Sequence, residues 1–197
     1  VLEAAVKGDP ELLPDSNTFC SDYEKILATL GELEPQVLVM TIPDPIDTAY
    51  FSTIDEAAKL TKVDAAFIRD TYNLRADDLI SPGGLFEIGY QMFAKAIKPL
   101  PEGVVVSAKV AHKIRGSVLQ LNEQLSALAR AHDALVYDLH AFFRRLEKEG
   151  ISIGSKRLTA EYLGGFYSIN GYYPGQTGHA LIANEILKRL NKAYGAH

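Results

Sequence analysis

Two uninterrupted apolar runs stand out along the chain. The first covers 37–42 and stops at Pro43, and the second covers 134–137 and stops at Asp138. Continuous apolarity with β-branching over this length is typical of a strand that is buried on both faces, as in a parallel sheet. Between the runs, the apolar positions of 108–131 recur in steps of three and four, which predicts a long amphipathic helix. This order predicts an α/β layered fold.

The segment from about 46 to 100 shows no comparable strand pattern. It predicts short helices at 54–60, 64–72 and 85–97, and we interpret it as a helical insertion that caps the carboxyl ends of the strands. Four large side chains of the insertion fit either a core or an acyl-binding lid: Phe86, Tyr90, Met92 and Phe93.

Three further helices complete the expected pattern. Ser21 is suited to cap a helix that ends at Gly31, and 141–148 also reads as helical. The last helix runs to about Lys192 and is expected to bury three apolar side chains: Ile182, Ile186 and Leu190.

Two strands make too small a sheet for independent stability. The sequence begins at Val1 rather than at Met. We therefore expect 1–197 to be the C-terminal part of a single doubly wound domain whose first strands precede it.

Composition and charge narrow the function classes. The chain has 197 residues, 47% of them hydrophobic, and a net charge of −5 without a basic stripe, so a nucleic-acid partner is not expected. No run of 18 apolar residues is present, so no membrane span is expected. The single cysteine, Cys20, excludes an internal disulfide and a cysteine-based zinc site.

Candidate chemistry lies where the strands end, because ligands bind at the carboxyl ends of parallel strands. These positions are Asp44, the segment 138–140 and the glycine-rich loop 164–179. From Phe166 to His179 the loop reads F-Y-S-I-N-G-Y-Y-P-G-Q-T-G-H.

This loop resembles the last block of the SGNH/GDSL family of serine esterases and lipases, F-S-x-D-G-x-H-P-T-x-x-G-H/Y-x-L-x-A-N. The strand ending in Ile42-Pro43-Asp44 is similar to the family's N-I-P-D, and 158–165 is similar to its L-T-x-x-x-G-G. The similarity is most specific over 158–187 and leaves out 46–100.

The resemblance implies a three-layer, flavodoxin-like SGNH-hydrolase fold with a parallel sheet, here without its N-terminal strands. It implies hydrolysis of carboxylic esters of lipids, short acyl groups or acetylated sugars, with no metal or organic cofactor. The implied partners are a small ester or acyl ligand and an N-terminal fragment of the same protein. Relatives of this type are mostly bacterial and often exported, to the periplasm or outside the cell.

Two departures from the family concern catalysis. No G-D-S is present, and Gly8-Asp9-Pro10 has proline where the nucleophilic serine is needed. The family's D-x-x-H dyad aligns with Asn170 and Tyr173. Tyrosine is protonated at neutral pH, and an Asp-to-Asn change in a serine triad lowers kcat by about 10⁴. His179 is the only nearby imidazole and fits either a structural role or a substituted base.

Three interpretations stay open. The chain is the C-terminal portion of an ester hydrolase that needs an upstream serine; or it is a non-catalytic pseudo-hydrolase that binds a ligand or acts as a scaffold; or it is an α/β interaction domain whose motif match is fortuitous. In each case we expect the chain alone to be inactive.

Overall fold

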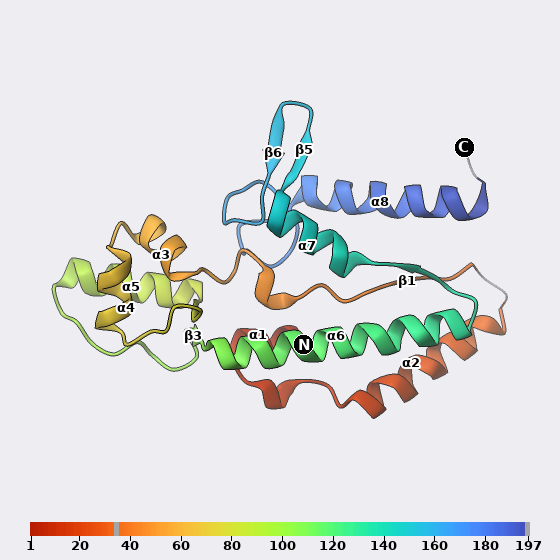
Figure 1. The fold of residues 1–197 in the computed structure, drawn as a ribbon, viewed down its shortest axis with the longest axis horizontal. Helices are drawn as coiled ribbons and strands as arrows, with labels where there is room; N and C mark the ends of the chain where they lie inside the picture. The colour runs from red at the N-terminus through yellow and green to blue at the C-terminus, as the bar shows by residue number, and fades with distance from the viewer. Residues whose placement is uncertain (34–35, 196–197) are drawn as a thin grey trace. The chain divides into compact units, whose positions relative to one another are not determined.

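The computed structural model describes residues 1–33 and 36–195, which divide into two compact units (Figure 1). Unit 1 comprises Val1–Leu13 and Ala49–Gly116, and unit 2 comprises Pro14–Thr48 and Ser117–His197. The long helix α6 (Ala108–Ala131) begins in unit 1 and continues in unit 2, at the bounds that the sequence predicted.

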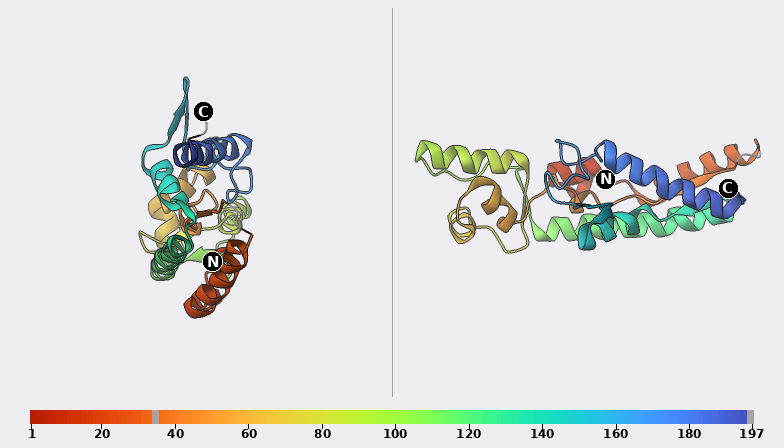
Figure 2. Two further views of the ribbon diagram at one scale, coloured as in Figure 1. Left: turned by 90° about the vertical axis from the view of Figure 1, so that its right-hand side faces the viewer. Right: turned by 90° about the horizontal axis from the view of Figure 1, so that it is seen from above.

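Unit 2 contains the predicted parallel pair. Strand β1 (Leu38–Met40) pairs with β4 (Leu135–Tyr137), with Val39 opposite Val136. Helices α2 (Ser16–Gly31) and α6 lie on one side of the strands, and α8 (Gln176–Tyr194) lies on the other (Figures 1 and 2). The core joins α2, β1 and α6 through five buried side chains: Leu27, Val39, Leu125, Ala129 and Ala134.

Helix α2 begins six residues earlier than expected. The Asp15 carboxylate accepts a hydrogen bond from the Thr18 N–H at 2.8 Å, so Asp15, and not Ser21, is the N-cap. The prediction failed because both residues are good caps, and the apolar face of the helix extends back to Phe19.

Unit 1 contains the insertion, whose three predicted helices are confirmed as α3 (Ile54–Thr61), α4 (Ala65–Thr71) and α5 (Pro82–Ala94). Their shared core consists of Ile54, Ala57, Ile68, Ile80 and Ile88. The unit also holds α1 (Leu2–Lys7), the short 3₁₀ turn η1 (Pro10–Leu12) and an unpredicted antiparallel pair, β2 (Leu79–Ile80) with β3 (Val105–Val106).

Other elements of unit 2 follow the two main strands. After β1 comes the 3₁₀ turn η2 (Pro45–Asp47), and after β4 comes α7 (Leu139–Glu149). A hairpin of β5 (Ile151–Ile153) and β6 (Lys156–Leu158) was not predicted. The fold is therefore mixed α/β, as expected, with only small sheets in the described residues. No helix in the described ranges is long and apolar enough to cross a membrane.

For three side chains of α5 the core alternative is wrong, and the burial expected on α8 is only partly observed. Phe86, Tyr90 and Phe93 are not core residues, because 73%, 57% and 88% of their surfaces are exposed. The apolar side of α8 is only partly buried, and the one fully buried position of this helix is Gly178. In both helices the periodicity marked an apolar face, but no described residue covers that face fully.

Candidate active-site loop

Backbone hydrogen bonds close the loop before α8 into a turn. The Gly175 N–H donates to the Phe166 carbonyl at 2.8 Å, and the Ser168 N–H donates to the Tyr173 carbonyl at 2.8 Å. The start of α8 packs closely against this turn, because a Cβ at Gly178 would lie 2.5 Å from the Phe166 carbonyl oxygen. Glycine at 178 thus permits the loop and the helix to approach each other.

Aromatic side chains anchor the loop beside the ends of both strands. Phe166 is fully buried against Phe142 and Phe143 of α7, the helix that follows β4. The Tyr167 hydroxyl donates to the carbonyl of Asp47, which follows β1, at 3.5 Å. The loop therefore lies at the carboxyl edge of the β1–β4 pair, as the sequence predicted.

Asn170 occupies the tip of the turn. Its Oδ1 atom accepts three hydrogen bonds: from the Ser168 hydroxyl at 2.7 Å, from the Tyr172 N–H at 3.0 Å and from the Tyr173 N–H at 3.1 Å. The structure thus brings together the two positions that align with the family dyad. The contact, however, uses the backbone of Tyr173, whose side chain is 58% exposed.

His179 lies in the first turn of α8 and is exposed. Its Nδ1 atom is 3.0 Å from the Gly175 carbonyl oxygen. A carbonyl only accepts, so Nδ1 carries the hydrogen, and in the neutral ring Nε2 holds the lone pair. Among the described residues no hydrogen bond joins His179 to Asn170 or Tyr173. The ring is oriented by backbone, which fits both the structural and the substituted-base interpretation.

The other strand-end candidates support local structure. The Asp138 carboxylate accepts from the Thr41 hydroxyl at 3.0 Å and from the Ala141 N–H at 2.9 Å, and so caps α7. The His140 N–H donates to the same Thr41 hydroxyl. Asp44 accepts from the Ile46 N–H and caps η2. These residues fix the ends of the strands rather than offer a reactive group.

Sequence analysis missed one polar cluster at this edge. Asp47 is 90% buried at its side chain and lies 3.5 Å from the Arg144 guanidinium of α7. The pKa of the buried Tyr167 hydroxyl is raised far above its usual value, first by burial and then by the negative charges of Asp47 and Glu147. A sequence signal for this cluster was available, because the acidic residue Asp47 closely follows the Pro-Asp-Pro segment that ends a buried strand.

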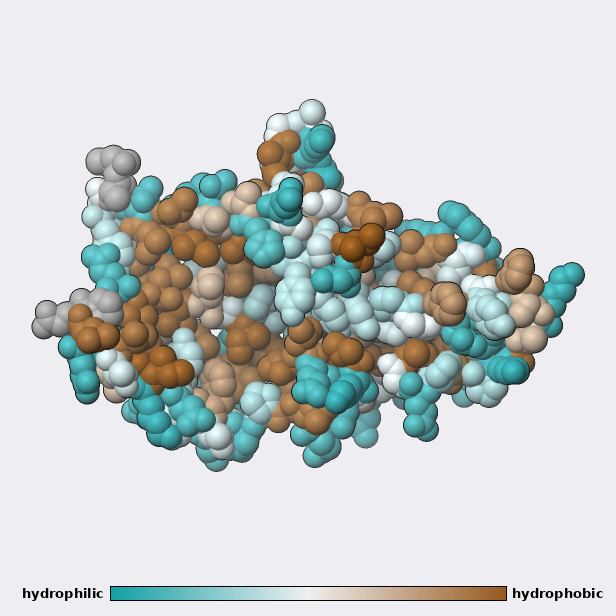
Figure 3. Space-filling model, turned by 180° about the vertical axis from the view of Figure 1, so that it is seen from behind, coloured by the Kyte–Doolittle hydropathy of each residue, from teal (hydrophilic) through white to brown (hydrophobic). Residues whose placement is uncertain are grey.

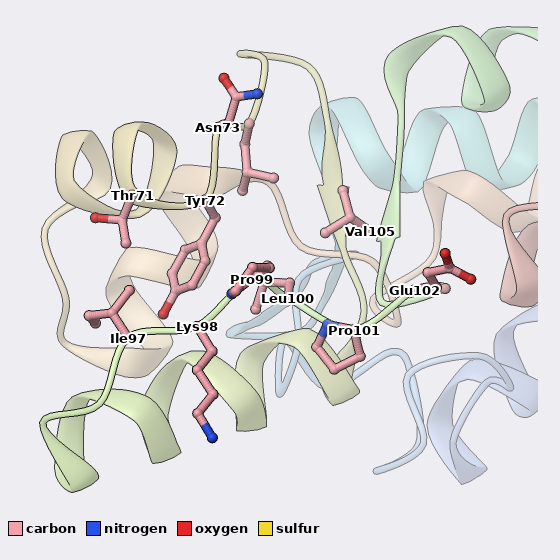
Figure 4. A pocket seen from close by; sticks show the side chains of 12 residues that line it. Thr71, Tyr72, Asn73, Ile97, Lys98, Pro99, Leu100, Pro101, Glu102 and Val105 are labelled. Atoms are coloured by element: carbon pink, nitrogen blue, oxygen red, sulfur yellow. The ribbon is translucent and has the colours of Figure 1, made fainter.

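Unit 1 holds a separate pocket of about 530 Å³. In Figure 4, Tyr72 lies at one side of the pocket and Pro101 at the other, with Pro99 and Leu100 between them. The wall is fixed by the buried Gln91, whose side-chain oxygen accepts from the Tyr72 hydroxyl at 3.1 Å and from the Lys98 N–H at 2.8 Å. The lining is mainly apolar, which suits an apolar ligand.

Comparisons with known proteins give no match: no family model, no curated protein and no solved structure is significantly similar to this chain. Within the described ranges, no three His, Cys, Asp or Glu side chains are grouped so that they could hold a metal ion.

Proposed function

We propose that this chain is the C-terminal portion of an SGNH/GDSL-like hydrolase that acts on carboxylic esters. Its substrates are lipid, short acyl or acetyl-sugar esters, and the serine nucleophile comes from a segment ahead of it. The observation that supports this proposal is the position of loop 164–179 beside the segments that follow β1 and β4. Ligands of parallel α/β sheets bind at this edge.

The chemistry of the loop defines what an active form would need. A seryl hydroxyl is activated by a base with a lone pair within hydrogen-bond reach. In the described loop, the one imidazole is His179, whose Nε2 holds a lone pair when the ring is neutral. Asn170 is neutral and its Oδ1 already accepts three bonds, so it cannot compensate an imidazolium charge as an aspartate does.

The test compares the chain with a longer polypeptide. For residues 1–197 alone we expect no turnover of p-nitrophenyl butyrate above background and no labelling by a fluorophosphonate. In the polypeptide that includes a G-D-S segment encoded ahead of Val1, the pair Asn170→Asp with Tyr173→His should raise ester hydrolysis at least about 100-fold.

Two controls separate the alternatives. If the longer wild-type polypeptide is active and His179→Ala abolishes its activity, His179 is the base. If the serine reacts with the fluorophosphonate but the Asp–His pair restores no hydrolysis, the ester-hydrolase proposal is wrong.

A non-catalytic ligand-binding module is the second candidate function. The pocket of unit 1 favours it, together with the absence of an Asp–His pair at the aligned positions. This candidate predicts that residues 1–197 bind a fluorescent fatty acid and that Ile97→Asp, in the pocket lining, weakens binding at least about tenfold. Phe93→Asp is the matched control, because Phe93 is 88% exposed and does not line the pocket.

A further inference from the structure

The outer side of α5 is an apolar helix face that is largely open in the described residues. Phe86, Tyr90 and Phe93 are spaced four and three residues apart, so their side chains lie on one face of the helix. All three side chains are more than half exposed, and the rings of Phe86 and Tyr90 stack at 6.3 Å. Beside them, a Cβ at Gly89 would point into open space. We call this surface the aromatic face of α5. Figure 3 shows apolar side chains exposed on unit 1, toward the right of the view.

The inner side of α5 holds the aromatic face outward. Ile88 and Gln91 are buried on the opposite side of the helix. Gly84 packs so closely that a Cβ there would lie 2.7 Å from the Ile80 side chain. The buried Gln91 also accepts a hydrogen bond from the Lys98 N–H at 2.8 Å. The helix therefore cannot turn to bury its rings without losing these contacts. Because a helix that is apolar on both sides is normally buried, the exposed face indicates a partner.

The exposed charges of the segment 82–98 are cationic. They are Lys95, which is the C-cap of α5, and Lys98, which follows shortly after it. Within the described part of the chain, neither lysine makes an ion pair. The one acid of the segment, Glu87, is partly buried and accepts from Nε2 of the inward-facing Gln91 at 2.9 Å. Exposed aromatic rings with uncompensated cations are complementary to an apolar phase that has an anionic boundary.

We infer that the aromatic face of α5 docks on the surface of an anionic lipid bilayer. The rings of Phe86 and Phe93 enter the apolar boundary, and the Tyr90 hydroxyl stays among the headgroups. Lys95 and Lys98 contact the anionic headgroups. The helix lies in the plane of the surface, as amphipathic interfacial helices do.

Other occupants suit this face less well. In a two-fold dimer the same surface meets itself, and the segment 82–98 offers no exposed acid to the two lysines. The face is also distinct from the pocket of unit 1, because none of its three rings lines that pocket. The inference therefore rests neither on ester hydrolysis nor on binding of a fatty acid in the pocket.

Tryptophan fluorescence tests the inference directly, because the chain contains no tryptophan. Phe93→Trp places a single reporter on the aromatic face. Leu119→Trp is the matched reporter on α6, where Leu119 is 50% exposed. With vesicles of phosphatidylcholine and phosphatidylserine, we expect the Phe93→Trp emission to shift to the blue and to be quenched by brominated lipid chains, while the Leu119→Trp emission stays unchanged. Unchanged emission at position 93, or an equal change at both positions, overturns the inference.

Cosedimentation with the same vesicles separates the apolar and the charged contributions. Phe86→Ser combined with Phe93→Ser should weaken binding at least about tenfold, because two buried rings are lost. Lys95→Gln combined with Lys98→Gln should weaken binding at least about tenfold on vesicles with phosphatidylserine and leave binding to pure phosphatidylcholine unchanged. Leu119→Ser is the control and should bind as the wild type does. If it weakens binding as much as the phenylalanine pair does, the inference is wrong.

Sedimentation velocity without lipid tests the competing occupant. We expect residues 1–197 to behave as they do with Phe93→Ser. If the wild type forms a dimer that Phe93→Ser dissociates, a second copy covers the aromatic face and the inference is overturned. Vesicle binding by a chain that hydrolyses no ester leaves the inference standing, so its outcome is separate from that of the proposed function.

Discussion

At the scale of single residues, the candidate loop is held by side chains that the motif similarity did not single out. Phe166 and Tyr167 bury the loop, while the aligned positions Asn170 and Tyr173 lie at its exposed tip. Burial has a chemical consequence for Tyr167, since it raises the pKa of the hydroxyl, and the charge of Asp47 raises it further.

The stability of the protein should therefore fall in alkali. Above about pH 10 an unfolded tyrosine loses its proton while folded Tyr167 keeps it, so the unfolded state binds fewer protons and unfolding becomes easier. One such group contributes a slope of about 1.4 kcal/mol per pH unit. Urea unfolding from about pH 9 to 11 should show a shallower fall for Tyr167→Phe than for the wild type. Tyr173→Phe, at an exposed position, is the control and should follow the wild type. Parallel curves for the wild type and Tyr167→Phe would contradict the prediction.

The three hydrogen bonds to Asn170 Oδ1 show why a sequence predicts the place of a site better than it predicts the contacts within the site. The aligned spacing correctly placed residues 170 and 173 in one turn before the last helix. It could not show that this oxygen is engaged with the Ser168 hydroxyl and two N–H groups, because that depends on the backbone path of the turn. An asparagine in a glycine-rich loop is as typical of a turn as of a degraded catalytic acid.

At the scale of elements, α5 shows the limit of periodicity. One of its faces buries Gly84, Ile88 and Gln91, while the opposite face exposes the aromatic side chains of Phe86 and Phe93. Both faces follow helical spacing, so the sequence predicted the helix but not which face the core would take. The β5–β6 hairpin was missed for a related reason, because three-residue strands around Gly154 are too short to display alternation.

Paired variants of α5 measure this asymmetry. Ile88→Ala should destabilise the protein by about 2–5 kcal/mol, because Ile88 is fully buried and its loss leaves a cavity. Phe93→Ser should change the free energy of unfolding by less than about 0.5 kcal/mol, because the ring is 88% exposed. Urea unfolding of both variants checks the prediction. A large cost for Phe93→Ser would show that the ring is covered in solution, contrary to the structure.

At the scale of the whole molecule, the sequence correctly indicated a parallel pair of strands and three short helices in the segment between them. The sequence showed two strands, too few for an independently stable sheet. The parallel sheet in the described residues likewise contains two strands, β1 and β4. The prediction of one domain stays a prediction, and it rested on chain length and motif order, neither of which reports contacts. The structure adds that 1–13 joins 49–116 in one unit, a long-range association that no local pattern in the sequence displays.

Each unit has its own core, and this leads to a prediction about cooperativity. Ile68 belongs to the core of unit 1, and Leu125 belongs to the core of unit 2. A buried side chain stabilises mainly the elements that it contacts. Ile68→Ala should therefore speed amide exchange in α3–α5 and leave exchange in β1 and β4 nearly unchanged. Leu125→Ala should speed exchange in β1 and β4 and leave exchange in α3–α5 nearly unchanged. Each substitution should cost about 2–5 kcal/mol in its own unit, and hydrogen exchange measured by mass spectrometry resolves the two sets of amides.

The two variants are matched controls for each other, since each leaves the other core intact. If either variant speeds exchange equally in both units, α6, which runs through both, couples them into a single cooperative structure, and the two units do not open independently.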